Sequence, residues 1–161
     1  MTLLAIDPSS TKTGYAVMAD SMTLLDAGFL KPDKTRDPAI MRIAAMTKQL
    51  GEVLDEWQPG KVLVEMPSAH AAGRLQGRAT GLAIYGFAAG AMWRACHAVT
   101  DTEVVDAQVW TRGVSKLKRQ QLICMAFPQY DSEKDKGGDI ADAIGLAVWW
   151  FSRQKAKRIA G

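Results

Sequence analysis

The sequence predicts an α/β domain in which three antiparallel strands come first and helices then alternate with parallel strands. Near the N-terminus, residues 3–6, 13–18 and 22–30 are short, rich in β-forming side chains and separated by turn residues, which is typical of an antiparallel meander. Residues 61–65 are apolar on both faces and therefore predict a central strand parallel to the first. A parallel pairing needs a long crossover, and the segment before this strand has the spacing of a helix.

The crossover helix has recognisable ends. Asp37 is expected to cap it with Pro38 at its first position, and apolar side chains follow at helical spacing as far as Trp57. Pro59-Gly60 then stops the helix. The remaining expected elements are a helix of small residues over 74–97, a strand over 102–105, a helix over 116–127 and a last helix over 139–151, where Trp149 and Trp150 are expected to pack.

Length and composition indicate one globular domain that spans residues 1–161. Hydrophobic residues make up 48% of the chain and charged residues 23%, which excludes a disordered protein. Cys96 and Cys124 stand 28 positions apart without a second pair, which argues against a disulfide scaffold or a zinc site. The longest apolar run, residues 79–93, is shorter than the about 20 residues that span a membrane, and no signal peptide precedes it. We expect a soluble, cytoplasmic protein with no membrane partner.

The formal charge of +3 is unevenly distributed along the chain. Acidic residues are absent from 66–100, from 107–130 and from everything after Asp142. Those stretches hold most of the arginines and lysines of the C-terminal half, whereas acidic residues gather over 131–142. A charge run is often only a solvated face, but three acid-free basic stretches predict a polyanionic partner.

Four acidic residues stand where elements of the predicted fold end or begin. Asp7 and Glu65 close two strands that are expected to be parallel neighbours, so both carboxylates emerge at the same edge of the sheet. Asp139 and Asp142 share one face of the first turn of the last helix. Each residue alone is equally consistent with a turn or a helix cap. Together they predict a site for hard cations such as Mg²⁺ or Mn²⁺, and a pair of such ions supports phosphodiester hydrolysis.

Three segments resemble, in order and at similar spacing, the motifs of the RuvC family of Holliday-junction resolvases. They are residues 4–17, 62–65 and 139–147, and the resemblance covers essentially the whole chain. It implies an RNase H-like fold, a mixed five-stranded sheet flanked by helices. It also implies that two Mg²⁺ ions, replaceable by Mn²⁺, are held by Asp7, Glu65, Asp139 and Asp142.

The implied activity is the resolution of four-way DNA junctions by a homodimer that places one site on each of two strands. The resemblance implies paired hydrolytic nicks that leave 5′-phosphate and 3′-hydroxyl ends. Lys116 and Lys118 lie where the family carries lysines that face the scissile phosphate, so both are candidate catalytic and DNA-binding residues. The other candidate DNA contacts are Arg74, Arg78, Arg119 and His70. Gly81, Gly86 and Gly90 match the region of the family's dimer interface, and close packing within the core explains them equally well.

The chain departs from the family pattern at two places. Ser9 stands where the family usually has glycine, and Ser68 stands where an aromatic residue commonly wedges into the junction. These departures indicate a phage-type relative with looser branch selectivity. His70 lies close to Ser68 and either touches DNA or is a simple loop residue.

Three other functions remain open at this point. The first is a nuclease of the same fold that cuts RNA–DNA hybrid, structured RNA, flaps or forks, as in YqgF-like proteins. The second is an actin-like nucleotide-binding fold, which needs a duplicated half that 161 residues cannot supply. The third is a junction-binding module with an inactive site, against which the complete set of four acidic residues argues.

Overall fold

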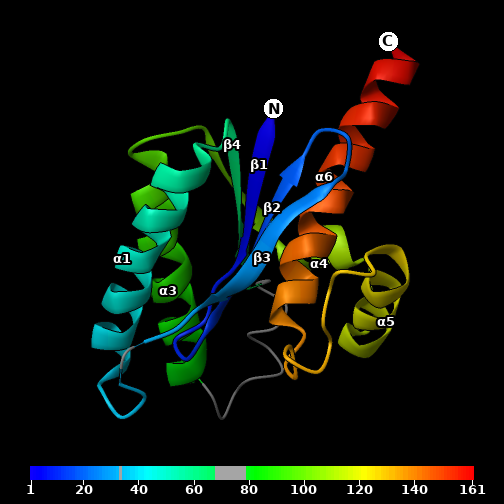
Figure 1. The fold of residues 1–161 in the computed structure, drawn as a ribbon. Coiled ribbons are helices and arrows are strands. Elements are labelled where there is room, and N and C mark those ends of the chain that lie inside the picture. The colour runs from blue at the N-terminus through cyan, green and yellow to red at the C-terminus, as the bar shows by residue number, and fades with distance from the viewer. Residues whose placement is uncertain (33, 68–78) are drawn as a thin grey trace.

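The computed structural model describes residues 1–32, 34–67 and 79–161 of the chain. Its centre is a five-stranded sheet with the strand order β3-β2-β1-β4-β5 (Figure 1). The strands are β1 (Thr2–Asp7), β2 (Thr13–Ala19), β3 (Leu24–Leu30), β4 (Lys61–Met66) and β5 (Thr102–Asp106). β1, β2 and β3 pair antiparallel, whereas β1, β4 and β5 pair parallel. The mixed sheet predicted from the sequence is therefore confirmed, including the central position of β4.

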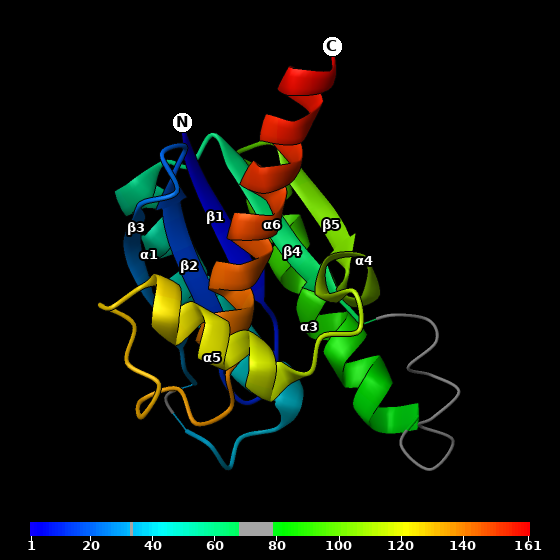
Figure 2. The same cartoon turned by 90° about the vertical axis from the view of Figure 1, so that its right-hand side faces the viewer.

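Helices cover both faces of this sheet (Figures 1 and 2). They are α1 (Ala39–Trp57), α3 (Ala79–His97), α4 (Ala107–Thr111), α5 (Lys116–Ala126) and α6 (Asp139–Ala160). Side chains alternate between the two faces along each strand, so β1 sends Leu4 and Ile6 towards α1 and α3 but Leu3 and Ala5 towards α6. Both clusters exclude water, which is why β1 is apolar at almost every position.

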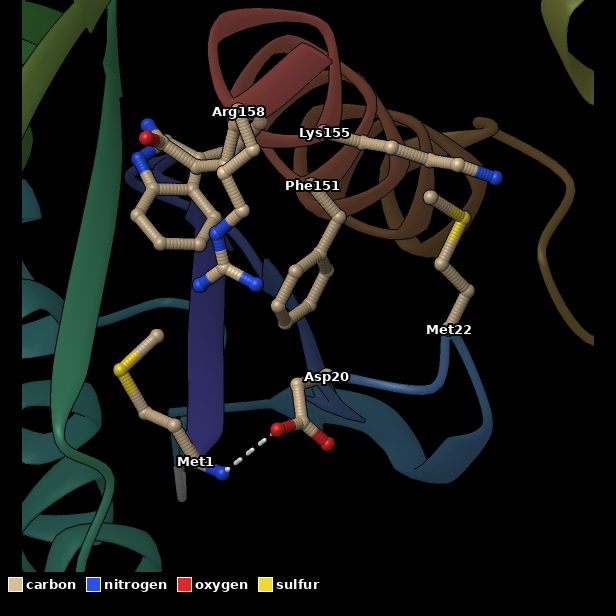
Figure 3. A pocket seen from close by; sticks show the side chains of 8 residues that line it. Met1, Asp20, Met22, Phe151, Lys155 and Arg158 are labelled. Carbon is tan, nitrogen blue, oxygen red and sulfur yellow. Dashed lines mark hydrogen bonds and ion pairs between the residues drawn. The ribbon is translucent and has the colours of Figure 1, made fainter. Parts of the chain in front are cut away.

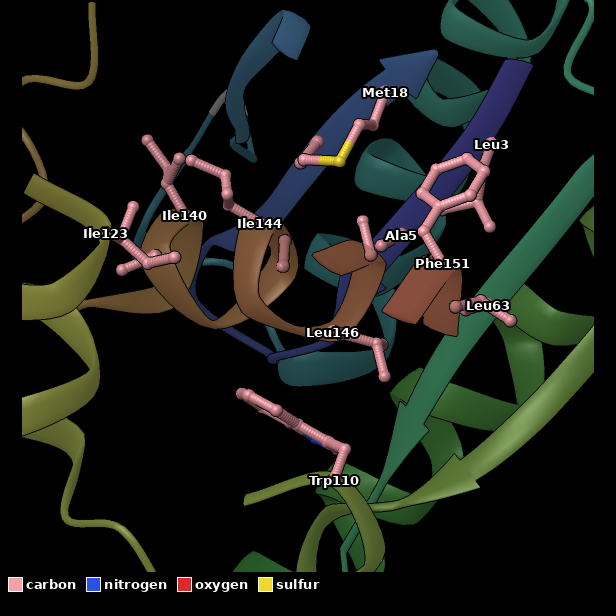
Figure 4. Close-up of a cluster of buried hydrophobic side chains, with 14 of the residues drawn as sticks. Leu3, Ala5, Met18, Leu63, Trp110, Ile123, Ile140, Ile144, Leu146 and Phe151 are labelled. Carbon is pink, nitrogen blue, oxygen red and sulfur yellow. The ribbon is translucent and has the colours of Figure 1, made fainter. Parts of the chain in front are cut away.

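The α6 side of the core shows how the helix is held against the sheet (Figure 4). Ile144 and Phe151 of α6 lie over Met18 and Leu3 of the antiparallel strands. At the N-terminal end of α6 the backbones come closer still, because a Cβ atom on Gly14 would collide with the backbone carbonyl of Asp139. Only glycine permits this approach, and it brings the start of α6 beside the end of β1, where Asp7 pairs with Gly14.

Two predicted boundaries are wrong for local reasons. Asp37 does not cap α1, since Pro38 occupies the cap position without a side-chain hydrogen bond and the helix begins at Ala39. The third strand begins at Leu24 rather than at residue 22, because Met22 adopts a positive φ of 59° in the turn before it.

One further helix boundary is wrong, and one helix was not predicted. α6 continues to Ala160, well past the predicted end at residue 151. The sequence pattern does not predict α4, because five residues are too few to show helical periodicity. The predicted packing of Trp149 and Trp150 against the core is confirmed. No described helix is long and apolar enough to cross a membrane.

Candidate active site

The structure brings the four predicted acidic residues into one cleft. Asp7 ends β1, Glu65 lies near the end of β4, and Asp139 and Asp142 occupy the first turn of α6. The cleft has a volume of about 480 Å³, and Asp7, Glu65 and Asp142 are each more than 90% buried within it. The other charged or phenolic side chains that line the cleft are Tyr85, Lys116 and Arg119. The convergence follows from the parallel pairing of β1 with β4 and from the close approach of α6 at Gly14.

Another acid, Asp135, fixes the start of α6. It is completely buried, and its two carboxylate oxygens accept hydrogen bonds from the backbone N–H groups of Asp139 and Ala141 at 3.0 and 2.9 Å. The hydroxyl of Tyr130 donates to the same carboxylate at 2.8 Å. Asp135 therefore caps the helix, and the interpretation of Asp139 as only a cap is wrong. The side chains of Asp139 and Asp142 are left free to face the cleft.

Lys116 supplies positive charge at the centre of the carboxylates. Its Nζ atom lies 2.7 Å from Asp139 Oδ1, 3.1 Å from Asp142 Oδ2 and 3.8 Å from Asp7 Oδ2. Burial lowers the pKa of the Lys116 ammonium, but Asp7, Asp139 and Asp142 outweigh burial and raise it above its ordinary value. The lysine is therefore fully charged, and it holds three of the four carboxylates together.

Arg119 and Lys118, both predicted to contact DNA, differ in their position relative to the cleft. Arg119 holds Asp142 with two hydrogen bonds, of 2.8 Å from Nε and 2.9 Å from Nη2, and its guanidinium lies over the ring of Trp110. Lys118 is exposed and does not line the cleft; its backbone N–H donates to Ser115, the cap of α5. The structure thus brings Lys116 and Arg119 into the cleft and leaves Lys118 outside it.

Two residues that the sequence interpretation missed hold Glu65. The indole N–H of Trp110 donates to Glu65 Oε2 at 2.8 Å, and the hydroxyl of Tyr85 lies 3.2 Å from Glu65 Oε1. The same hydroxyl lies 3.3 Å from Asp7 Oδ1, so Tyr85 bridges the two strand-end carboxylates. Each residue offers a weak sequence signal, since a buried tryptophan or tyrosine in an apolar helix needs a partner for its polar atom. That signal does not say which partner.

Negative charge at the strand ends remains incompletely compensated. Burial raises the pKa of Asp7 well above its ordinary value, and the neighbouring Glu65 carboxylate adds to the shift. Burial likewise raises the pKa of Glu65 to about 7, with a further contribution from Asp142, against the opposing hydrogen bonds from Trp110 and Tyr85. Carboxylates in this condition favour the arrival of a cation.

The donor set fits a hard divalent cation in its chemistry, because every candidate ligand is a carboxylate oxygen. As the side chains stand, no three acidic, histidine or cysteine residues in the described part of the chain surround one point closely enough to share an ion. The ammonium of Lys116 lies between the carboxylates of Asp7, Asp139 and Asp142 instead. A shared metal ion would take over the charge that Lys116 now neutralises. The predicted contacts His70, Arg74 and Arg78, together with Ser68, lie outside the described residues.

Comparisons with known proteins agree with the motifs and the fold. The family model described as crossover junction endodeoxyribonuclease RuvC matches residues 3–150. A curated protein of that name from Oleidesulfovibrio alaskensis is 28% identical, over 99% of this chain and 96% of its own length. One from Citrifermentans bemidjiense is 30% identical, over 92% of this chain and 90% of its own length.

Solved structures show the same fold. RuvC of Thermus thermophilus in complex with a Holliday junction substrate has a TM-score of 0.75 at 19% identity, over 96% of each chain. The yeast mitochondrial Holliday junction resolvase has a TM-score of 0.61 at 12% identity, over 97% of this chain and 82% of its own. The expected RNase H-like fold is confirmed by these neighbours. Because the family model matches most of the length of this chain, the chain belongs to the RuvC family of crossover junction endodeoxyribonucleases.

Proposed function

We propose that residues 1–161 form one nuclease domain that resolves four-way DNA junctions by metal-dependent hydrolysis. The observation that carries the proposal is the convergence of Asp7, Glu65, Asp139 and Asp142 in one cleft of a RuvC-family chain. The family's name and the Holliday junction substrate bound to the Thermus thermophilus relative support this choice of DNA.

The four carboxylates are the proposed metal ligands. Two Mg²⁺ ions, or Mn²⁺ in their place, would activate water and stabilise the leaving oxygen of the phosphodiester. Trp110 and Tyr85 act as positioning residues, because they fix both oxygens of Glu65 and one oxygen of Asp7. Arg119 positions Asp142 in the same way, and it remains a predicted contact to DNA.

Lys116 is the proposed catalytic lysine. Its long side chain is 43% exposed, so its ammonium has room to leave the carboxylates and face the scissile phosphate when metal ions occupy the site. There it would stabilise the negative charge that develops in the transition state. Lys118 stands two residues along on the exposed side of α5 and, with Arg74, Arg78 and His70, remains a predicted contact to the DNA backbone.

A homodimer is proposed, with α3 at its interface. A Cβ atom added to Gly81, Gly86 or Gly90 would meet no described atom within 4 Å, so these glycines do not serve close packing within the described chain. On the same helix Phe87 is 50% exposed. Small residues beside an exposed aromatic ring fit a second copy of the helix, and two copies would present two sites to two strands of a junction.

The proposal is tested with four substrates side by side: a synthetic four-way junction, a flap, a fork and an RNA–DNA hybrid. The wild-type protein with Mg²⁺ is expected to cut the junction in paired, symmetric positions, and Asp7→Asn is expected to cut none of the four. A protein that cuts hybrid in preference to the junction would instead be a hybrid nuclease of the same fold. Equal products from wild type and Asp7→Asn would mean that the cleft is not the site of cleavage.

A further inference from the structure

The C-terminal part of α6 forms an arm that projects beyond the sheet (Figures 1 and 2). Residues 152–159 are exposed, except for the half-buried Gln154, whereas Phe151 just before them is buried. The arm therefore contributes little to the core. An isolated helix of this length is not stable in water, so its helical state depends on continuity with α6 and on whatever it contacts.

The arm carries four cations and no acid: Arg153, Lys155, Lys157 and Arg158. None of them forms an ion pair with a residue in the described part of the chain; Arg153 lies over the ring of Trp149 at 5.4 Å. The helix dipole favours cations in the last turn only, which accounts for Lys157 and Arg158 but not for the two that precede them. Four cations without an acidic partner at the end of an exposed helix create a local excess of positive charge.

A hollow at the root of the arm extends this positive surface (Figure 3). Its volume is about 430 Å³, and Lys155 and Arg158 line it together with Met1, Met22 and Phe151. The carboxylate of Asp20, which also lines the hollow, is neutralised by the terminal amine of Met1 at 3.2 Å. The hollow therefore combines an apolar floor with a cationic wall, and its charge is complementary to a phosphate chain.

The arm and the cleft lie at the two ends of one helix. The four cations stand 14 to 19 residues after Asp139, the first residue of α6, so at about 1.5 Å per residue they lie about 21–29 Å along the helix from it. Duplex DNA rises about 3.4 Å per base pair, so this separation equals about six to eight base pairs. A duplex that leaves the cleft along α6 reaches the arm within one helical turn.

We propose that the α6 arm binds the phosphate backbone of a junction arm about six to eight base pairs from the nicked phosphate. The inference rests on the proposed function, since it takes the duplex to be held at the cleft. Contacts to phosphate alone carry no sequence information, so the arm would add affinity and orientation without sequence preference.

Junctions with arms of different length test this contact. One junction has hairpin-capped arms of about five base pairs, which end before the α6 arm, and the other has arms of about 25 base pairs. The quadruple variant Arg153→Gln, Lys155→Gln, Lys157→Gln and Arg158→Gln is expected to bind the long junction at least tenfold more weakly near 0.15 M salt. The plot of its log binding constant against log salt concentration should become less steep. The slope should decrease in magnitude by about 0.9 for each phosphate that the variant no longer neutralises, or by about 3 to 4 in all. Binding and cleavage of the short junction should stay at the wild-type level.

A charge-conserving variant is the matched control. Arg153→Lys, Lys155→Arg, Lys157→Arg and Arg158→Lys keeps all four charges and should bind the long junction as the wild type does. Unchanged binding of the long junction by the glutamine variant would overturn the inference, and so would an equal loss on both junctions. Binding and cleavage are measured separately, so the two proposals can fail independently. If the wild-type protein cuts neither junction, the proposed function is wrong, whatever the binding results show for the arm.

Discussion

At the scale of single residues, the cleft is defined by which atom holds which carboxylate. Glu65 is held at one oxygen by Trp110 and at the other by Tyr85, and Asp142 is held at both oxygens by Arg119. Lys116 alone touches three carboxylates. These contacts divide the surrounding residues into those that orient the ligands and the lysines that compete with a metal for them. Lys12 is a second such lysine, with its Nζ atom 3.2 Å from Asp139 Oδ2.

Trp110→Phe removes the N–H donor to Glu65 while keeping a ring beneath Arg119. Because hydrogen bonds from outside a metal site orient its ligands, we expect Mn²⁺ affinity to fall by about tenfold or more. Isothermal titration of the purified variant with Mn²⁺ measures this directly. Trp149→Phe is the control, since Trp149 packs against the core and does not line the cleft; equal losses in both variants would show an effect of packing alone.

Lys116→Gln is expected to move metal binding and catalysis in opposite directions. Removing the competing ammonium should raise Mn²⁺ affinity several-fold, whereas loss of charge near the phosphate should lower the cleavage rate by about 10². Lys118→Gln should leave Mn²⁺ affinity unchanged, because Lys118 does not line the cleft. A Lys116→Gln protein with weaker Mn²⁺ binding would contradict the placement of Lys116 as a competitor.

The raised pKa of Glu65 gives the metal-free protein an unusual dependence of stability on pH. Its pKa is about 7 in the fold against 4.5 ordinarily, so between these values the folded state binds a proton that the unfolded state does not. Stability therefore falls as pH rises from 4.5 through 7, by up to about 3 kcal/mol for this group. Thermal unfolding in EDTA should show a lower Tm near pH 8 than near pH 5.5. Glu65→Gln should weaken this dependence of Tm on pH. If Tm varies with pH in that variant as it does in the wild type, the dependence comes from other groups.

At the scale of elements, the position of α6 depends on the small size of Gly14. Gly14→Ala places a methyl group on the backbone of Asp139, so it should lower the free energy of unfolding by several kcal/mol and displace two carboxylates. Gly51→Ala is the matched control: it lies in α1 with nothing within 4 Å of the new methyl, and should stabilise the protein by about 0.5–1 kcal/mol. Chemical denaturation distinguishes the two; similar small effects would mean that α6 can shift.

The limits of sequence-based prediction are also visible in the elements. The antiparallel meander, the central place of β4 and the meeting of Asp7 with Glu65 follow from apolar patterns and from the crossover, which are local properties of the chain. The role of Asp135 as the cap of α6 is not predictable in this way, because it stands four residues before the first helical residue and reaches it only through the loop. The role of Trp110 is not predictable because α4 is too short to show helical periodicity. The close approach at Gly14 is not predictable either, because its neighbour Asp139 lies far along the chain. Contacts between distant segments that no strand pairing implies have no signature in one sequence.

At the scale of the whole molecule, charge is separated along α6. The acidic cleft lies at its N-terminal end and a basic arm lies at its C-terminal end, and α3 covers the opposite face of the sheet (Figure 1). The small formal charge of +3 for the whole chain does not reveal this separation, because the four acidic residues and the four cations cancel. Such an arrangement suits a protein that neutralises its own carboxylates with cations and meets phosphates elsewhere on its surface.

The central claim is that two copies of this cleft nick two strands of one junction. Its most direct test is a supercoiled plasmid that extrudes a cruciform, incubated with the wild-type protein and Mg²⁺. Paired nicks across the cruciform should give linear DNA with hairpin ends, whose nicks a DNA ligase can seal through their 5′-phosphates. Asp7→Asn should leave the plasmid supercoiled. Linear product from Asp7→Asn, or only singly nicked circles from the wild type, would contradict the account.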